Sequence, residues 1–219
     1  MRYGTVNFEY AADLATREPE VDGPIFMVNF MKYRTVADYK GDAATSGISG
    51  MEADDKYAPT EVLAKIGADV AFFGRIVAQG DDGEWDRMGI VRYPTRRAFI
   101  EMQSRQDFKE KHVHKEAGMD YTIVCGSLPA GPHVEIPRKG YVTFRITAGP
   151  VEVSPSSTVA SLAVEGTILG DGRTWRHLTM SWSDDVPTCE AVARGGDEMI
   201  VVAQAEIDRM GKLLTSRGN

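Results

Sequence analysis

The sequence has no long apolar segment and no surplus of positive charge. None of its apolar runs reaches the roughly 18 residues that a membrane-spanning helix needs, and Met1–Asp13 carries charges where a signal peptide is apolar. We therefore expect a soluble, cytoplasmic protein without a membrane partner. The 32 acidic residues outnumber the 25 lysines and arginines, giving a net charge of −7. This balance argues against nucleic-acid binding and favours a small-molecule substrate.

Cysteine and short catalytic motifs are also scarce. The two cysteines, Cys125 and Cys189, lie far apart in the sequence and have no Cys-x-x-Cys spacing, so both are predicted to be small core residues. No G-x-G-x-x-G, Walker, G-x-S-x-G or H-E-x-x-H motif is present. These absences argue against nucleotide, flavin and serine-hydrolase mechanisms.

Hydrophobic periodicity divides the first part of the chain into strands and helices. Strands are predicted at 25–33, 69–79, 85–93 and 120–127, with a turn at 80–83. Helices are predicted at 35–44 and 57–67, followed by one broken or two short helices within 95–118. The last of these is expected to begin at Ser104, with Asp107 three residues later as a variant capping box. This β-α-β-β-α-β order is that of a ferredoxin-like unit.

The second part of the chain repeats the first in reduced form. Residues 166–178 resemble 74–88, and 140–145 align with the first strand, but too few residues follow for a crossover helix. A helix is expected after Asp185 and a closing strand at 198–208. The segment 125–140 is rich in Pro and Gly and indicates a linker, so we expect domains at 1–131 and 132–219 with the boundary near Pro132. The predicted fold class is α+β, with two ferredoxin-like halves, the second degenerate, whose antiparallel sheets pack against each other.

Four stretches carry a resemblance to a known superfamily: PIFMVNFMKYR, ISGMEADDKY, WDRMGIVRYPTRRAF and FKEKHVHKEAGMDYTIV. Over about residues 20–128 the chain resembles an uncharacterised family, a domain of unknown function, within the dimeric α/β-barrel superfamily. The resemblance implies paired ferredoxin-like sheets, a small-molecule pocket between sheet and helices, and a homodimer. Relatives in that superfamily include cofactor-free polyketide monooxygenases, muconolactone-isomerase-like proteins, haem-degrading enzymes, chlorite dismutases and aldoxime dehydratases. The resemblance therefore does not select a reaction.

The first strand places a polar amide in an apolar row. Alternation puts Met27, Asn29, Met31 and Tyr33 on one face. Asn29 is then expected either to make structural hydrogen bonds or to face a ligand, with Tyr33 beside it.

Two histidines in the region of helix 95–118 are candidates for general acid–base chemistry. His112 and His114 point in different directions on a helix, so the pair is not expected to chelate one metal ion, and no metal site is predicted. Helical periodicity places His112 near the inward direction of Phe108. The resemblance instead sets His114 at the histidine position of the family. Both are kept as candidate bases for an activated carbon or phenol.

Polar and aromatic residues on other strands are candidates for substrate binding. Arg75, Arg92 and Arg145 lie among apolar neighbours and are expected either to hold an oxyanion or carboxylate, or to form ion pairs at the surface or in the interior. Trp85 stands at a repeat-related position, where either a core role or stacking on a ligand is expected.

Three functional hypotheses follow. The first is an enzyme that needs no cofactor and uses histidine acid–base chemistry on an apolar, aromatic or polyketide-like metabolite, in a monooxygenase-, isomerase- or cyclase-like reaction of secondary metabolism. The second is a haem- or metal-dependent enzyme of the same fold, with His177 as the haem ligand. The third is a non-catalytic ligand-binding or oligomerisation module. The polar segment 45–55 is expected either to form a lid over the mouth of the pocket in the first half or to be an ordinary surface loop.

Overall fold

The computed structural model describes residues 4–41, 47–80, 85–131, 136, 139–149, 159–189 and 197–215. The helices are α1 (Phe8–Thr16), α2 (Gly50–Tyr57), α3 (Thr60–Lys65), α4 (Arg96–Ser104), α5 (Gln106–Gly118) and α6 (Met210–Thr215). The strands are β1 (Thr5–Val6), β2 (Ile25–Tyr33), β3 (Asp69–Gln79), β4 (Arg87–Tyr93), β5 (Met119–Ala130), β6 (Tyr141–Thr147), β7 (Val159–Gly170), β8 (His177–Ser183) and β9 (Glu198–Asp208). Within these ranges, no helix is both long enough and apolar enough to span a bilayer.

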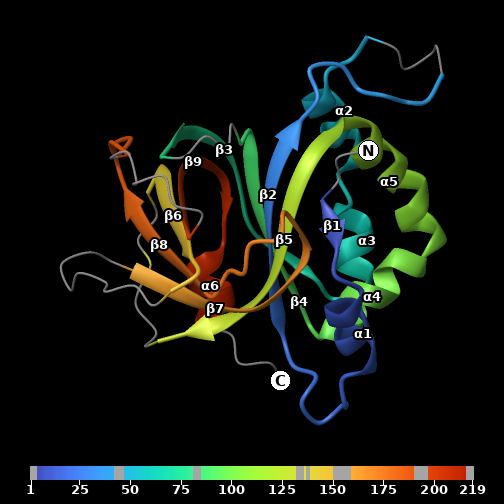
Figure 1. The fold of residues 1–219 in the computed structure, drawn as a ribbon, viewed down its shortest axis with the longest axis horizontal. Helices are drawn as coiled ribbons and strands as arrows, with labels where there is room; N and C mark the ends of the chain where they lie inside the picture. The colour runs from blue at the N-terminus through green and yellow to red at the C-terminus, as the bar shows by residue number, and fades with distance from the viewer. Residues whose placement is uncertain are drawn as a thin grey trace.

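Eight of the strands form a closed antiparallel barrel (Figure 1). Neighbouring strands run in the order β7-β5-β2-β4-β3-β9-β6-β8, and β8 pairs with β7 to close the ring, while β1 adds a short ninth strand to β7. The protein is therefore an α+β protein whose two sequence segments share one barrel. This arrangement confirms that the sheets of the two segments pack together within one chain.

The two segments order their strands in the same way. In the first segment the order β5-β2-β4-β3 places the fourth strand beside the first, then the third and the second. In the second segment β9-β6-β8-β7 repeats that pattern. The first segment carries α2 to α5 between its strands, whereas the described part of the second segment has no helix between its strands.

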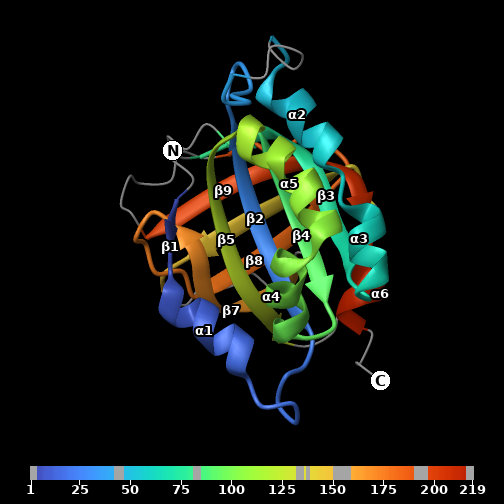
Figure 2. The ribbon, with the colours of Figure 1, turned by 90° about the vertical axis from the view of Figure 1, so that its right-hand side faces the viewer.

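Strand alternation divides the apolar side chains between two cores. Phe26, Val28 and Phe30 of β2 point into the barrel, where they meet side chains of the second segment such as Phe144, whose ring centroid lies 4.8 Å from that of Phe72. The opposite face of β2 is covered by helices. Figure 2 shows α4 and α5 lying across β5, β2 and β4, with α3 beside β3.

Tyr10 packs helix α1 against the barrel, together with the fully buried Leu14. The Tyr10 ring lies over Gly126 and Gly166, which face each other on β5 and β7, and a Cβ at Gly166 would lie only 2.7 Å from ring atoms. The Tyr10 hydroxyl donates a hydrogen bond of 3.0 Å to Glu165, which also accepts from Arg96 at 2.5 Å. Because these paired glycines have no side chains, the strands leave room for the Tyr10 ring.

Two helices meet by backbone contact at one end of the barrel. The Gly50 N–H at the start of α2 donates to the Arg34 carbonyl, and the Arg34 N–H donates to the Gly118 carbonyl at the end of α5. A Cβ at Gly50 would lie 2.3 Å from the Gly118 oxygen, and a Cβ at Gly118 would lie 2.3 Å from the Gly50 oxygen. Only glycine permits this approach of α2 to α5.

Several predicted elements differ from the structure. Residues 35–41 are not helical, because their backbone groups bond to other segments, with the Ala37 N–H bonded to the Ile48 carbonyl and the Asp38 N–H to that of Ala117. Part of the predicted lid is instead α2, which begins with a capping box between Ser49 and Glu52.

Smaller predictions also need correction. Helix α5 begins after Arg105 without a side-chain cap, so the predicted capping box at Ser104 and Asp107 is wrong. Cys125 is buried as predicted, but Cys189 is only half-buried. Pro132, most of the turn at 80–83 and residues 190–196 lie outside the described residues.

Candidate functional site

A cavity of about 500 Å³ lies between the helix-covered face of the barrel and the helices. Its floor comes from β2, β3, β4 and β5, and its walls from α2 to α5. Most of its lining is apolar, including Met27, Met31, Val70, Phe72, Phe73, Val91, Val124, Leu63, Phe99, Ile100, Met102 and Phe108. A volume of this size is typical of small-molecule sites.

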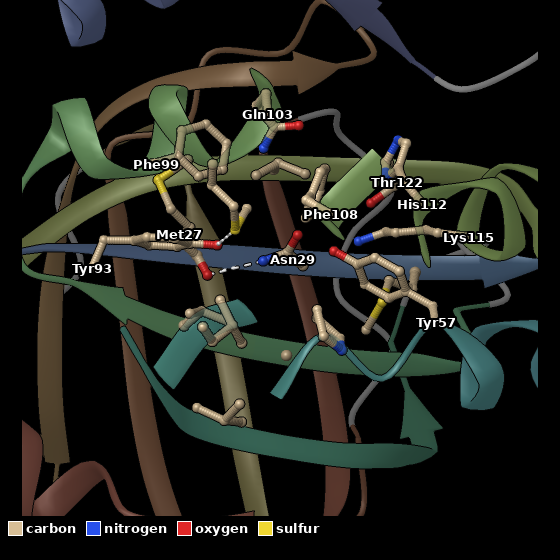
Figure 3. A pocket seen from close by; sticks show the side chains of 18 of the residues that line it. Met27, Asn29, Tyr57, Tyr93, Phe99, Gln103, Phe108, His112, Lys115 and Thr122 are labelled. Atoms are coloured by element: carbon tan, nitrogen blue, oxygen red, sulfur yellow. Dashed lines mark hydrogen bonds between the residues drawn. The ribbon is translucent and has the colours of Figure 1, made fainter. Parts of the chain in front are cut away.

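Three polar lining groups meet in one part of the cavity (Figure 3). Asn29 on β2, Tyr57 at the end of α2 and Lys115 on α5 point toward one another across it. The Asn29 Nδ2 donates 2.9 Å to the Met27 carbonyl, while its carbonyl oxygen faces the side on which Tyr57 and Lys115 lie. A few polar atoms in an apolar cavity determine how a ligand is oriented.

Helix α5 presents Phe108, His112 and Lys115 to the cavity, at a spacing that places them on one helical face. The His112 ring stacks on Phe108, with centroids 5.0 Å apart, and meets the edge of Tyr57 at 6.0 Å. Burial is the main cause that lowers the pKa of His112, and Glu116, 4.0 Å from Nε2, opposes this only in part. The imidazole is therefore neutral at physiological pH and can accept a proton.

Lys115 has a less usual environment. The residue as a whole is partly exposed, but its Nζ points into the cavity and lies 5.2 Å from the centroid of the Tyr57 ring. Burial lowers the pKa of Lys115, and the negative charge of Asp54 partly offsets this effect.

A buried charge network lies at the end of the cavity next to α2. The Tyr33 hydroxyl donates 2.5 Å to Asp54 Oδ2, and Arg87 Nη1 lies 2.7 Å from Asp55 and 3.7 Å from Asp54. The Arg87 and Asp54 side chains are only 3% and 6% exposed, so this pair lies in a medium where charge interactions are strong. Burial and the Asp54 carboxylate raise the pKa of Tyr33, so its phenol stays protonated and holds Asp54 in place.

The structure brings only part of the predicted site together. Asn29 and His112 line the cavity, and Tyr33 borders it through its bond to Asp54. His114 does not line it, since its Nδ1 lies 2.8 Å from the hydroxyl of Tyr39 on the other side of α5. Of the two histidines, periodicity thus selects the one at the cavity, and alignment by resemblance selects the other.

The arginines predicted to bind substrate do not line the cavity, because each one either forms an ion pair with a glutamate or lies on the barrel side of its strand. Arg75 is exposed and pairs with Glu206 at 3.1 Å, and Arg145 pairs with Glu198 on the outside of β6. Arg92 faces Phe26 across the β2–β4 pair and so shares the barrel side of the sheet.

The predicted roles of Trp85 and His177 also differ from their positions: neither side chain lines the cavity. Trp85 is buried in the barrel interior, 5.9 Å from the Phe30 ring, where it fills the core. His177 begins β8 on the face opposite the buried Leu178, so it does not approach the cavity.

Sequence reasoning missed Tyr57, Asp54 and Lys115. Lys115 follows Phe108 and His112 at i+7 and i+3, which is the signal that would have placed it on the inward face. The other two residues lie on α2, which the S-x-x-E pattern at 49–52 indicates.

Comparison with known proteins gives a fold and no function. No protein-family model matches the chain, and no curated protein sequence matches it. A protein of unknown function from Rhodopseudomonas palustris is similar in structure, with a TM-score of 0.51 and 24% identity over 60% of this chain and 100% of that one. A methylated form of that protein matches with a TM-score of 0.51 and 25% identity, over 60% of this chain and 97% of that one.

A more distant structure covers most of the chain. A mutant chlorite dismutase from Candidatus Nitrospira defluvii has a TM-score of 0.48 and 9% identity over 94% of this chain and 97% of that one.

Proposed function

We propose that the protein is an enzyme that acts on a small apolar or aromatic, polyketide-like molecule by acid–base chemistry at His112, without a nucleotide cofactor. The observation that supports this most is a neutral imidazole on the wall of an apolar cavity of about 500 Å³, beside the few polar groups that line it. A base in such a place meets its substrate largely free of water.

The first step is proton transfer. His112 removes a proton from an activated carbon or a phenol, and the electron pair moves onto the oxygen of the substrate to give an enolate or phenolate. Tyr57 supplies a hydroxyl and Asn29 an amide at the same part of the cavity, and both orient that oxygen. Monooxygenase-, isomerase- and cyclase-like reactions can all begin with this step.

We also propose that the chain belongs to the dimeric α/β-barrel superfamily and consists of two ferredoxin-like halves. The repeated order of fourth, first, third and second strand supports this, together with four helices on one half. A homodimer in the cytoplasm, formed with a second copy of the chain, belongs to the same proposal. Freedom from haem and metal is tested by the absorption spectrum and metal content of the purified protein.

The test of the proposed function isolates proton transfer from any later reaction. The protein is incubated with 2-tetralone in deuterated buffer, and exchange of the acidic C–H is followed by NMR. We expect exchange above the buffer rate, lost in His112→Asn and retained in His114→Asn. Its rate should fall with acidification at a midpoint below about 6.5, the ordinary histidine pKa, because the pKa of His112 is lowered.

Two outcomes contradict the proposal. Exchange that survives His112→Asn would show that another group is the base. Binding of 2-tetralone without any exchange would instead favour a non-catalytic binding module.

A further inference from the structure

Lys115 places an amine in an apolar space without an acceptor. In the part of the chain that the structure describes, its Nζ makes no hydrogen bond and has no carboxylate within 4.0 Å, and it lies over the face of Tyr57, 5.2 Å from the ring centroid. The surrounding cavity wall is formed largely by aromatic and aliphatic side chains. Apart from its contact with the Tyr57 ring, the amine forms no ion pair within the described ranges.

The charged groups around Lys115 compensate for its burial only in part. Asp54 on α2 is the carboxylate that acts on it; its Oδ2 accepts from Tyr33 and lies 3.7 Å from Arg87 on β4, and its Oδ1 is buried without a hydrogen-bond partner among the described residues. Asp55 pairs with the same guanidinium. His112, one turn earlier on α5, is neutral.

Burial therefore favours the neutral form of the amine. An unpaired ammonium in an apolar medium costs several kcal/mol, and this cost is relieved when the proton is released. The direction of the Lys115 pKa agrees with this argument from its surroundings. A neutral primary amine that faces an apolar cavity is a nucleophile toward carbonyl carbon.

We propose that Lys115 forms an imine with apolar or aromatic aldehydes and ketones that enter the cavity. The Nζ lone pair attacks the carbonyl carbon, and a proton moves from nitrogen to oxygen to give a carbinolamine. The oxygen then leaves as water while the C=N bond forms, so one amine and one carbonyl compound give one imine and one water. No oxidant or reductant takes part.

The polar groups near Lys115 suit the oxygen in this reaction. The Tyr57 hydroxyl points to the same part of the cavity and donates to the carbonyl oxygen, which makes the carbon more electrophilic. The apolar lining selects the body of the ligand, and the volume of about 500 Å³ accepts a fused two-ring molecule. Formation of the imine does not require His112, so a test of the imine does not depend on the proposed function.

The test is reductive trapping with 2-naphthaldehyde and sodium cyanoborohydride near neutral pH, read by intact mass and peptide mapping. We expect one equivalent of label, located on Lys115, with little on the exposed lysines. Lys115→Met should abolish this label, whereas Lys109→Met, which changes an exposed lysine of the same helix, should retain it. Lys115→Arg keeps a cation and forms no imine, and serves if the methionine variant does not fold.

Further controls separate the site from surface chemistry. 2-Methylnaphthalene has the same ring system without a carbonyl and should slow labelling of Lys115 by competing for the cavity. Labelling should persist at lower pH for Lys115 than for the exposed lysines. Label spread evenly over surface lysines, or an unchanged total in Lys115→Met, would overturn the proposal.

The two proposals fail in different ways. His112→Asn should remove proton exchange from 2-tetralone and leave labelling of Lys115 intact. Loss of labelling in Lys115→Arg with exchange retained would leave the acid–base proposal standing on His112.

Discussion

Replacement of Gly118 by alanine tests whether backbone contact between α2 and α5 shapes the cavity. The new Cβ would lie 2.3 Å from the Gly50 carbonyl oxygen and 3.0 Å from the Ala53 Cβ, whereas real Cβ contacts essentially never fall below 3.0 Å. The obstacle is backbone, so no side chain can rotate away and the two helices must separate. Overpacking of this kind costs about 1–3 kcal/mol of unfolding free energy.

The assay for Gly118→Ala is thermal unfolding beside a matched control. For a chain of this size we expect the midpoint to fall by roughly 3–10 °C. Gly23→Ala is the control, because a Cβ there meets nothing within 4 Å. Since α2 carries Tyr57 and α5 carries Lys115, labelling by 2-naphthaldehyde should also slow in Gly118→Ala. If Gly118→Ala has the same unfolding midpoint as Gly23→Ala, and its Lys115 is labelled at the wild-type rate, the backbone contact does not position the two helices.

Three further predictions concern charge and association. Acidification from pH 7 to pH 5 should lower the free energy of unfolding, because His112 takes up a proton near pH 6.5 in the unfolded chain and only at lower pH in the folded chain. In urea titrations, His112→Gln should reduce this dependence of stability on pH. Tyr10→Phe should lower the free energy of unfolding by about 1.5–3 kcal/mol in the same titrations, because it removes the hydrogen bond to the Glu165 carboxylate. An unchanged midpoint would show that only the packing of the Tyr10 ring holds α1. Sedimentation should give twice the mass of the chain, and a clean monomer would refute the homodimer.

The strands were predictable from the sequence because alternation is a local signal. The ranges 25–33, 69–79 and 198–208 match β2, β3 and β9 residue for residue. The helix predicted at 35–44 is not formed over 35–41, because the partners of the backbone groups there, such as the carbonyls of Ile48 and Ala117, are set by tertiary packing. Helix α2 was missed although Ser49 and Glu52 carry its capping signal.

The site was predictable only in part. Asn29 and His112 follow from periodicity within one strand and one helix. The meeting of Tyr57, Asp54 and Lys115 depends on how α2 packs on α5, which rests on two glycines distant in sequence, Gly50 and Gly118. The two alternatives for Arg75 and Arg145 could not be separated from the sequence, because the local pattern around a strand arginine is the same whether its partner is a ligand or a glutamate such as Glu206.

The one-sided distribution of the helices has a consequence for stoichiometry. In Figure 1, α1 to α5 lie on one side of the barrel, while β6 and β8 carry no helix in the part of the chain that the structure describes. A cavity between sheet and helix therefore forms in the first segment, and the second segment contributes the far wall of the barrel. Titration calorimetry should then give one ligand per polypeptide, although each barrel contains two repeats of the same strand order.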